Sequence, residues 1–298
     1  MLEIKGLTKK YKDKLALDNF TYTFEKGVYG LLGPNGAGKS TLMNILVDGI
    51  KKSGGDIRYN GKNITKLGYK YRDIIGYVPQ QSFLFKGTIA SNVSYGDNPL
   101  DTTDAGIVDM ADTSTAAGRK REKELIATQN EHRTLTSEQR ADVRNACEVA
   151  QATEFIATKE KQYDSAISQG GSNVSGGQKQ RLSIARAVYR HPEILIFDDS
   201  FSALDFKTDR AVRDALAKEA KDSTKLIVAQ RIGTIMDADR IVVLDDGKVV
   251  GQGTHSELLE NCDVYRQIAQ SQLSEDELNG GKSGESKLPG ETGKPIET

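Results

Sequence analysis

Residues 33–41 read Gly33-Pro34-Asn35-Gly36-Ala37-Gly38-Lys39-Ser40-Thr41, and this stretch decides the fold. It follows the apolar run from Val28 to Leu32, which predicts a buried strand, and it precedes the helical pattern from Thr41 to Val47. The spacing fits G-x-x-x-x-G-K-[ST], the pattern of a phosphate-binding loop that joins a strand to a helix. A glycine-rich turn that merely ends a strand is the alternative.

The residue types of this loop suit phosphate and Mg²⁺. Glycines let backbone N–H groups turn inward around phosphate oxygens, and the N-terminus of the following helix adds positive potential. Lys39 can reach the β- and γ-phosphates, and the Ser40 hydroxyl can ligate Mg²⁺. Farther along the chain, an apolar strand from Ile194 ends in the carboxylate of Asp198. After a phosphate loop, such a carboxylate is suited to hold Mg²⁺ beside the nucleotide.

A second candidate phosphate site lies at Asn173-Val174-Ser175-Gly176-Gly177-Gln178-Lys179-Gln180-Arg181. Ser175 and the amides of Gly176 and Gly177 open the helical pattern that runs from Gln178 to Arg190. The N-terminus of this helix can therefore receive a phosphate in the same way as the first loop. A loop that only caps the helix is the alternative.

Together these motifs resemble the ATP-binding domains of ABC (ATP-binding cassette) transporters, whose signature motif reads LSGGQ. The chain departs from that motif at one position, where Val174 replaces Leu, and it matches at Ser175, Gly176, Gly177 and Gln178. The resemblance covers Leu2 to Gln272 apart from an internal insertion. It implies an α/β P-loop NTPase fold of ABC type, with a mainly parallel sheet core, an antiparallel β subdomain and a helical subdomain.

The resemblance also implies ligands and partners. ATP and Mg²⁺ are the expected ligands. In the family, two such domains pair head to tail, and each ATP lies between the P-loop of one domain and the signature of the other. We therefore expect a second ATP-binding domain, identical or different, and a transmembrane domain or subunit of an ABC transporter as partners. The expected location is the cytoplasm, at the cytoplasmic face of the cell membrane.

Further residues match family positions beside these motifs. Tyr11 matches the aromatic that stacks on adenine, and an exposed strand aromatic is the alternative. Gln80 matches the glutamine that senses Mg²⁺ and water, with Gln81 as the alternative register. The resemblance thus implies a Mg²⁺ site made by Ser40, Gln80 and Asp198. The loop that communicates across the dimer matches Ser202, Ala203, Leu204 and Asp205.

Two positions depart from the family, and both departures are expected to slow ATP hydrolysis. The residue after Asp198 is normally Glu but is Asp199 here, and the switch His after the next strand is replaced by Gln230. The shorter Asp side chain retracts the carboxylate, and a misplacement on the order of 1 Å can cost about 10²-fold in rate. Gln cannot carry a proton as His does. Asp199, Gln230 and Gln80 form the expected catalytic set. The replacements at Asp199 and Gln230 resemble those in the degenerate subunit of heterodimeric ABC exporters, which hydrolyses ATP slowly.

Two further stretches, 83–89 and 168–171, resemble exporter elements that touch transmembrane coupling helices, with ordinary loop chemistry as the alternative. By contrast, residues 29–45 resemble the stand-alone ATPase subunits of antibiotic-resistance-type transporters. The change from resemblance to stand-alone subunits to resemblance to exporters falls near Gln80 and Gln81. This pattern indicates a mosaic, natural or engineered, and plain variation within the family is the alternative.

Composition adds limits on partners and location. Lys and Arg number 41 and Asp and Glu 42, so the formal net charge of −1 gives no reason to expect nucleic acid. Cys147 and Cys262 have neither metal-site spacing nor a disulfide framework, which fits a reducing cytosol. We find no signal-peptide pattern and no apolar stretch of about 20 residues. Any membrane role is therefore expected to act through a partner.

The predicted organisation is one ATP-binding domain over residues 1–272 and a disordered tail over 273–298. No Phe, Tyr or Trp occurs from Gly96 to Glu154, and a flexible charged insertion is predicted at about 97–145. Two other classes of function stay open. One is an ATP-gated regulatory module, and the other is a non-transport ABC ATPase that acts on DNA or the ribosome. The latter usually shows a long coiled coil, a Cys-x-x-Cys hook or a second P-loop, and none occurs in this sequence.

Overall fold

The computed structural model describes residues 1–67, 69–95 and 135–274. Its strands are β1 Leu2–Tyr11, β2 Lys14–Phe24, β3 Gly27–Leu32, β4 Gly54–Tyr59, β5 Lys62–Asn63, β6 Ile75–Val78, β7 Gly87–Thr88, β8 Ala166–Ile167, β9 Ile194–Asp198, β10 Thr224–Val228, β11 Arg240–Asp245 and β12 Lys248–Gly253. Its α-helices are α1 Lys39–Leu46, α2 Ile64–Leu67, α3 Tyr69–Asp73, α4 Ile89–Val93, α6 Ser137–Val149, α7 Thr153–Ala157, α8 Gly176–Tyr189, α9 Phe206–Glu219, α10 His255–Asn261 and α11 Asp263–Gln272. Short 3₁₀ turns are η2 Gln162–Asp164, η3 Gln169–Gly171 and η4 Ile232–Thr234.

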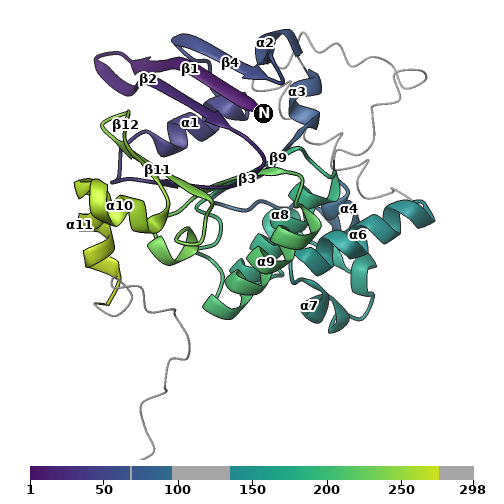
Figure 1. Ribbon diagram of the computed structural model, residues 1–298. Helices are drawn as coiled ribbons and strands as arrows, with labels where there is room; N and C mark the ends of the chain where they lie inside the picture. Colours follow the sequence, from purple (N-terminus) through teal and green to yellow (C-terminus); the bar gives the residue numbers. More distant parts are fainter. Residues whose placement is uncertain (68, 96–134, 275–298) are drawn as a thin grey trace, which may run out of the picture.

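A six-stranded sheet in the order β12-β11-β3-β10-β9-β6 forms the centre of the molecule (Figure 1). Its strands run parallel except β12, which pairs antiparallel with β11 at the edge. The strand before the phosphate loop, β3, lies between β10 and β11 and runs parallel to both. The structure thus confirms the predicted α/β fold with a mainly parallel core. The β11 and β12 strands form a hairpin that turns at Asp246 and Gly247.

Alternate side chains of the central strands enter two separate cores. Ile194 and Ile196 of β9 belong to the core on one face of the sheet, whereas Leu195 and Phe197 belong to the core on the other. Successive side chains of a strand point to opposite faces, so a strand covered on both sides needs apolar residues at every position. This requirement explains the continuous apolar runs of the sequence.

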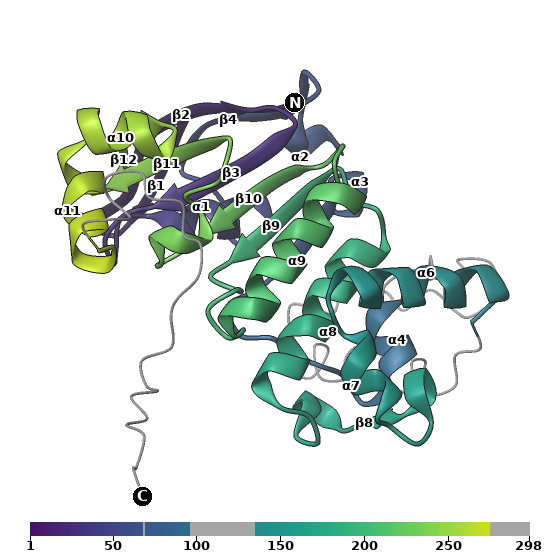
Figure 2. The same ribbon diagram turned by 60° about the horizontal axis from the view of Figure 1, so that its bottom comes forward.

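One layer above the central sheet is an antiparallel sheet in the order β2-β1-β4-β5, with α1 between the two sheets (Figure 1). The opposite face of the central sheet is covered by helices that include α8 and α9. Figure 2 shows α6, α7 and α8 together at one end of the molecule, away from α10 and α11. The predicted antiparallel β region near the N-terminus and the predicted helical region around the signature are both present.

The predicted flexible insertion at 97–145 falls mostly outside the described residues, as does most of the predicted disordered tail at 273–298. The end of the insertion is described, because α6 begins at Ser137 and buries Val143. Thr136 caps this helix with its side chain, and Gln139 completes the capping box. Among the described residues, no helix is both long enough and apolar enough to cross a bilayer.

Gly76 on β6 lies against the backbone of α8, and its replacement tests this packing. A Cβ at residue 76 would lie 2.4 Å from the carbonyl oxygen of Ala187 and 2.8 Å from Cγ of Pro192. We expect Gly76→Ala to destabilise the fold by about 2 kcal/mol, as overpacking does, and to lower the thermal midpoint by about 4–8 °C. Gly233→Ala is the control, because a Cβ there meets no atom within 4 Å. Equal midpoints of the two variants in calorimetry would contradict this account.

Candidate functional site

The phosphate loop is built around glycines that no other residue can replace without rearrangement. Gly33 and Gly38 have φ angles of 149° and 102°. A Cβ at Gly33 would lie 2.1 Å from the carbonyl oxygen of Leu244, and one at Gly38 would lie 2.4 Å from that of Ala16. The loop is therefore pressed between β11 and the start of β2, and α1 begins directly after it at Lys39.

Lys39 lies inside this loop, with only 8% of the residue exposed. Its Nζ donates hydrogen bonds to the carbonyl oxygens of Gly33 at 2.6 Å and Pro34 at 3.0 Å. Burial lowers the pKa of Lys39, while the nearby carboxylates of Asp199 and Asp198 raise it. A buried ammonium whose two acceptors here are carbonyl oxygens of the loop is well placed to exchange these bonds for phosphate oxygens.

The end of β9 brings two carboxylates to the same site. Asp198 is buried, and the Tyr77 hydroxyl of β6 donates a 3.4 Å hydrogen bond to it. Burial raises the pKa of Asp198, chiefly because the charged form loses solvation. Burial and the neighbouring Asp198 also raise the pKa of Tyr77 to about 12. Tyr77 was not predicted as a site residue, and its position on the strand that leads to Gln80 is the only sequence signal for it.

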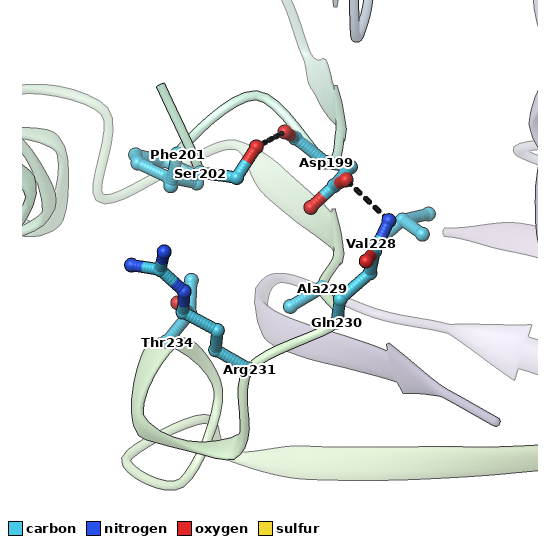
Figure 3. A pocket seen from close by; sticks show the side chains of 8 residues that line it. All are labelled: Asp199, Phe201, Ser202, Val228, Ala229, Gln230, Arg231 and Thr234. Atoms are coloured by element: carbon cyan, nitrogen blue, oxygen red, sulfur yellow. Dashed lines mark hydrogen bonds between the residues drawn. The ribbon is translucent and has the colours of Figure 1, made fainter. Parts of the chain in front are cut away.

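Asp199 lies between the other two predicted catalytic residues. Its Oδ2 accepts a 3.0 Å hydrogen bond from Nε2 of Gln80 and a 2.7 Å hydrogen bond from Nε2 of Gln230. Figure 3 shows the Gln230 side chain pointing directly at this carboxylate, and both residues line the same small pocket. Burial raises the pKa of Asp199, and the hydrogen bond from Gln80 counteracts it. The structure thus brings Gln80, Asp199 and Gln230 together as predicted.

The backbone at Asp199 has a left-handed conformation, with φ of 48°. Asp is among the non-glycine residues that tolerate this region best. The conformation is held by hydrogen bonds on both sides of the residue, from its N–H to the carbonyl of Val228 at 3.0 Å and from the Ser202 hydroxyl to its carbonyl at 2.8 Å. The carboxylate is therefore fixed in place by the backbone as well as by its two amide donors.

The signature residues open α8 as predicted. Ser175 is the N-cap, its hydroxyl accepts from the N–H of Gln178, and the Gln178 side chain accepts from the N–H of Ser175. Gly176 is exposed, and a Cβ there meets no atom within 4 Å. Val174 is buried in the core under α8, so the Val that replaces Leu keeps an apolar anchor. Within the part of the chain that the structure describes, no side chain therefore crowds the helix end at Gly176.

The signature and the phosphate loop do not meet within the chain. The buried side chains of α1 belong to the core between the two sheets, whereas those of α8 belong to the core on the opposite face of the central sheet. Among the described residues, no hydrogen bond or ion pair joins residues 33–41 to residues 174–178. One copy of the chain therefore has two separate candidate phosphate sites, one at the N-terminus of α1 and one at the N-terminus of α8.

The other predicted residues lie as follows. Tyr11 ends β1 with 45% of its surface exposed, and Nζ of Lys9 lies 4.7 Å from its ring centroid. In the predicted dimer loop, Ser202 and Ala203 are exposed while Leu204 is buried. Asp205 caps α9 by accepting from the N–H of Thr208 at 2.9 Å. These positions are compatible with contacts to adenine and to another subunit, and those roles stay predictions.

The two predicted exporter elements lie side by side. Residues 87–88 and 166–167 pair as β7 and β8, and the N–H of Gly170 donates to the carbonyl of Leu84 at 2.8 Å. Phe83, at the start of the first element, is 48% exposed. A single surface therefore contains both elements.

Arg186 of α8, a residue that the sequence analysis missed, ties the signature helix to this surface. Its guanidinium donates to the carbonyl oxygens of Phe83 and Asn92 at 2.9 Å and 2.8 Å, and to Oδ1 of Asn92 at 2.9 Å. It also lies over the stacked rings of Phe85 and Tyr95. Burial lowers the pKa of Arg186 to about 10. Because its acceptors lie 94 and 103 residues away, no local pattern could have indicated this role.

Ser40, Gln80 and Asp198 offer a hydroxyl, an amide oxygen and a carboxylate, which are the hard oxygen donors that Mg²⁺ prefers. Among the described residues, no group of three or more His, Cys, Asp and Glu side chains is arranged to hold a metal ion. The donor set therefore fits a Mg²⁺ ion that is shared with nucleotide phosphates, the arrangement typical of this ion, rather than a site made by the protein alone.

Comparison with known proteins assigns the chain to a described group. The sequence model of the ABC transporter family matches residues 17–202. The ABC multidrug transporter MDR2 of Trichophyton rubrum is 38% identical over 253 residues, which is 84% of this chain and 16% of that protein. The ABC transporter ATP-binding protein MG014 of Mycoplasma genitalium is 36% identical over 270 residues, or 90% of this chain and 38% of that protein.

A solved structure gives the same result. A bacterial Atm1-family ABC exporter with ATP bound matches with a TM-score of 0.74 and 29% identity, covering 92% of this chain and 42% of that one. This chain thus spans less than half the length of each of these relatives. The predicted mosaic origin of the sequence is tested by none of these matches and stays a prediction.

The raised pKa of Asp198 predicts a pH-dependent gain in stability when its charge is removed. The folded state binds this proton more tightly than the unfolded state, so stability is lost as the pH rises through the raised pKa. At pH 7.5, without nucleotide, we expect Asp198→Asn to raise the thermal midpoint by about 2–4 °C, which corresponds to about 1 kcal/mol. Near pH 4 the gain should shrink, because the unmodified residue takes up its proton.

Asp222→Asn is the control for this measurement. The exposed Asp222 accepts a hydrogen bond from Lys26 that lowers its pKa, so removing its charge should raise the midpoint at neither pH. A midpoint of Asp198→Asn that lies below that of the unmodified chain at pH 7.5 would contradict the burial argument.

Proposed function

Because the chain belongs to the ABC transporter family and contains its ATP-binding domain, we propose that it drives export across a membrane by binding ATP and hydrolysing it slowly. The ATP-binding domains of this family are ATPases. The observation that carries the proposal is the meeting of Lys39, Asp198 and Asp199 at one edge of the central sheet, where Gln80 and Gln230 both donate to Asp199.

ATP binding rests on residues 33–41. The N–H groups of the loop and the N-terminus of α1, which begins at Lys39, would bind the phosphates, and the buried Lys39 would supply a cation there. Tyr11 would stack on the adenine. Mg²⁺, held by Ser40, Gln80 and Asp198, would neutralise charge on the phosphate oxygens when bound. The ion would also offset the cost of burying the Asp198 carboxylate.

Hydrolysis rests on Asp199. As a base, its carboxylate would orient the attacking water, but its side chain is shorter than the Glu normally found there. Gln230 donates to the carboxylate through an amide, which can hold the base in place but cannot take up or release a proton. We therefore propose that positioning is intact while the chemical step is slow, and that a second site formed with a more active partner performs most turnover.

The separation of the two phosphate-binding helix ends supports a head-to-tail pair. Each copy exposes a signature that its own phosphate loop does not reach, so Ser175, Gly176, Gly177 and Gln178 would contact ATP held by another ATP-binding domain. Residues 202–205 would lie between the two domains. In our proposal the partner is a different subunit, because a site that hydrolyses ATP slowly needs a second, competent site to perform most of the turnover.

The membrane partner would dock on the surface made by residues 83–89 and 168–171, which places the chain at the cytoplasmic face. Export is favoured over import because the solved relative is an exporter and the Trichophyton relative is a multidrug transporter. An ATP-gated regulatory module is the alternative, and Asp199 and Gln230 are the residues that favour it. Recovery of a transmembrane subunit bound to the chain would support the transport role.

Replacement of Lys39 tests nucleotide binding. Lys39→Ala removes the only side-chain cation of the loop, and we expect the affinity for Mg-ATP to fall by about tenfold or more, the effect of losing a charge-assisted hydrogen bond. Lys26→Ala is the control, because Lys26 is exposed and pairs with Asp222 at 2.9 Å. Titration calorimetry that gives the two variants the same affinity would refute the phosphate-loop assignment.

Restoration of the two departing residues tests slow turnover. We expect Asp199→Glu to raise steady-state phosphate release at saturating Mg-ATP by up to about 10²-fold, because it extends the carboxylate. Asp199→Glu with Gln230→His should raise it further than either change alone, since both act on one transition state. Dimerisation and thermal stability are checked in all four proteins, because Glu tolerates the left-handed backbone less well than Asp. An unmodified chain as fast as the double variant would show that Asp199 is a competent base.

A further inference from the structure

The C-terminal helix reaches the loop that carries Gln230. The α11 helix is firmly packed, since Tyr265 and Ala269 are fully buried and the Tyr265 hydroxyl lies 2.6 Å from Nδ1 of His255 on α10. Arg266 fixes its first turn by donating to the carbonyl oxygens of Leu259 and Glu260 at 2.8 Å and 2.7 Å. The last residue of α11, Gln272, therefore extends from a rigid support.

Gln272 makes two hydrogen bonds to the backbone on either side of Arg231. Its Nε2 donates to the carbonyl oxygen of Gln230 at 2.8 Å, and its Oε1 accepts from the N–H of Ile232 at 2.9 Å. One amide thus uses its donor and its acceptor on the same short segment, between the end of β10 and the η4 turn. Two bonds of opposite polarity fix the segment's position and its rotation together.

The segment that Gln272 binds, residues 230–232, also determines how the Gln230 side chain is oriented toward Asp199. The Gln230 side chain donates to Asp199 at 2.7 Å while its own carbonyl oxygen is held by Gln272. A chain of contacts therefore runs from α11 through Gln272 and Gln230 to the carboxylate at the end of β9. A catalytic group must be held to within a fraction of an ångström, so the residue that fixes its backbone affects the chemical step.

We propose that Gln272 is a positioning residue for ATP hydrolysis. Through Gln272, the packing of α11 determines how the Gln230 side chain is oriented toward Asp199. This proposal rests on the proposed function of Asp199 and Gln230 as the hydrolytic site. It assigns a role to the last turn of α11, 42 residues along the chain from Gln230, where the sequence motifs indicated nothing. It also means that a partner that displaces α11 lowers turnover without touching the nucleotide.

The direct test is the state of the Gln230 side-chain amide in ¹⁵N NMR spectra of the full chain, with its signals assigned by their loss in Gln230→Ala. Gln272→Met preserves length but removes both hydrogen bonds. We expect it to shift the Gln230 amide signals, because the backbone that aims this amide is released. Gln270→Met, an exposed residue of the same helix, is the matched control and should leave them unchanged. Unchanged Gln230 signals in Gln272→Met would overturn the proposal.

Turnover supplies the second readout, measured in the Asp199→Glu background as well as in the unmodified chain. Gln272→Met should lower kcat by about threefold to tenfold and leave the Kd for Mg-ATP within about twofold, because it touches only the hydrolytic residues. In a Gln230→Ala background the effect of Gln272→Met should vanish. An equal loss in that background would show a merely structural role and overturn the proposal.

The two readouts also separate this proposal from the proposed function. If no variant binds or hydrolyses ATP, the proposed function fails, and the NMR comparison still decides whether Gln272 positions Gln230. Gln272→Glu adds a third comparison, since it keeps the acceptor for Ile232 but puts a carboxylate oxygen against the carbonyl of Gln230. It should shift the Gln230 amide signals as Gln272→Met does, and unchanged signals would count against the donor bond.

Discussion

The hydrogen bonds that Asp199 accepts from Gln80 and Gln230 join three segments on which the proposed ATP hydrolysis depends. These segments follow β9, β6 and β10. Asp199 is buried, so its carboxylate needs hydrogen-bond donors, and the two amides provide them. Gln80 begins the segment that leads to the exporter-like surface, and Gln230 follows β10. Any movement of either segment would therefore change the surroundings of the proposed base, which would give the proposed membrane partner a physical route to a bound nucleotide.

The same segment is held from the other side by α8. The Ser82 hydroxyl donates to the buried Gln180 at 2.5 Å, and Arg186 binds the backbone at Phe83 and Asn92. These hydrogen bonds tie the helix that presents the signature to the segment that presents Gln80. In the proposed head-to-tail pair, a signature that contacts ATP on another subunit would sense the same displacement as Gln80, and the two sites would thereby be linked.

Local patterns were sufficient to predict the phosphate loop, the buried strands and the capped signature helix, because each depends on residues close in sequence. The meeting of Gln80, Asp199 and Gln230 was predicted through a resemblance and confirmed by their hydrogen bonds. The contacts of Tyr77 with Asp198, of Arg186 with Asn92 and of Gln272 with Gln230 were missed. They span 121, 94 and 42 residues, and such pairings depend on tertiary packing that no local pattern encodes.

The central claim is that this chain binds Mg-ATP with an intact loop and hydrolyses it with a shortened base. The most direct measurement mixes the chain in excess with labelled Mg-ATP and follows the chemical identity of the bound nucleotide over time. A typical enzyme turns over about 10 times per second. We expect the bound nucleotide to be still mostly ATP long after that interval. Conversion of the bound ATP to ADP at the rate of a typical enzyme would contradict the central claim.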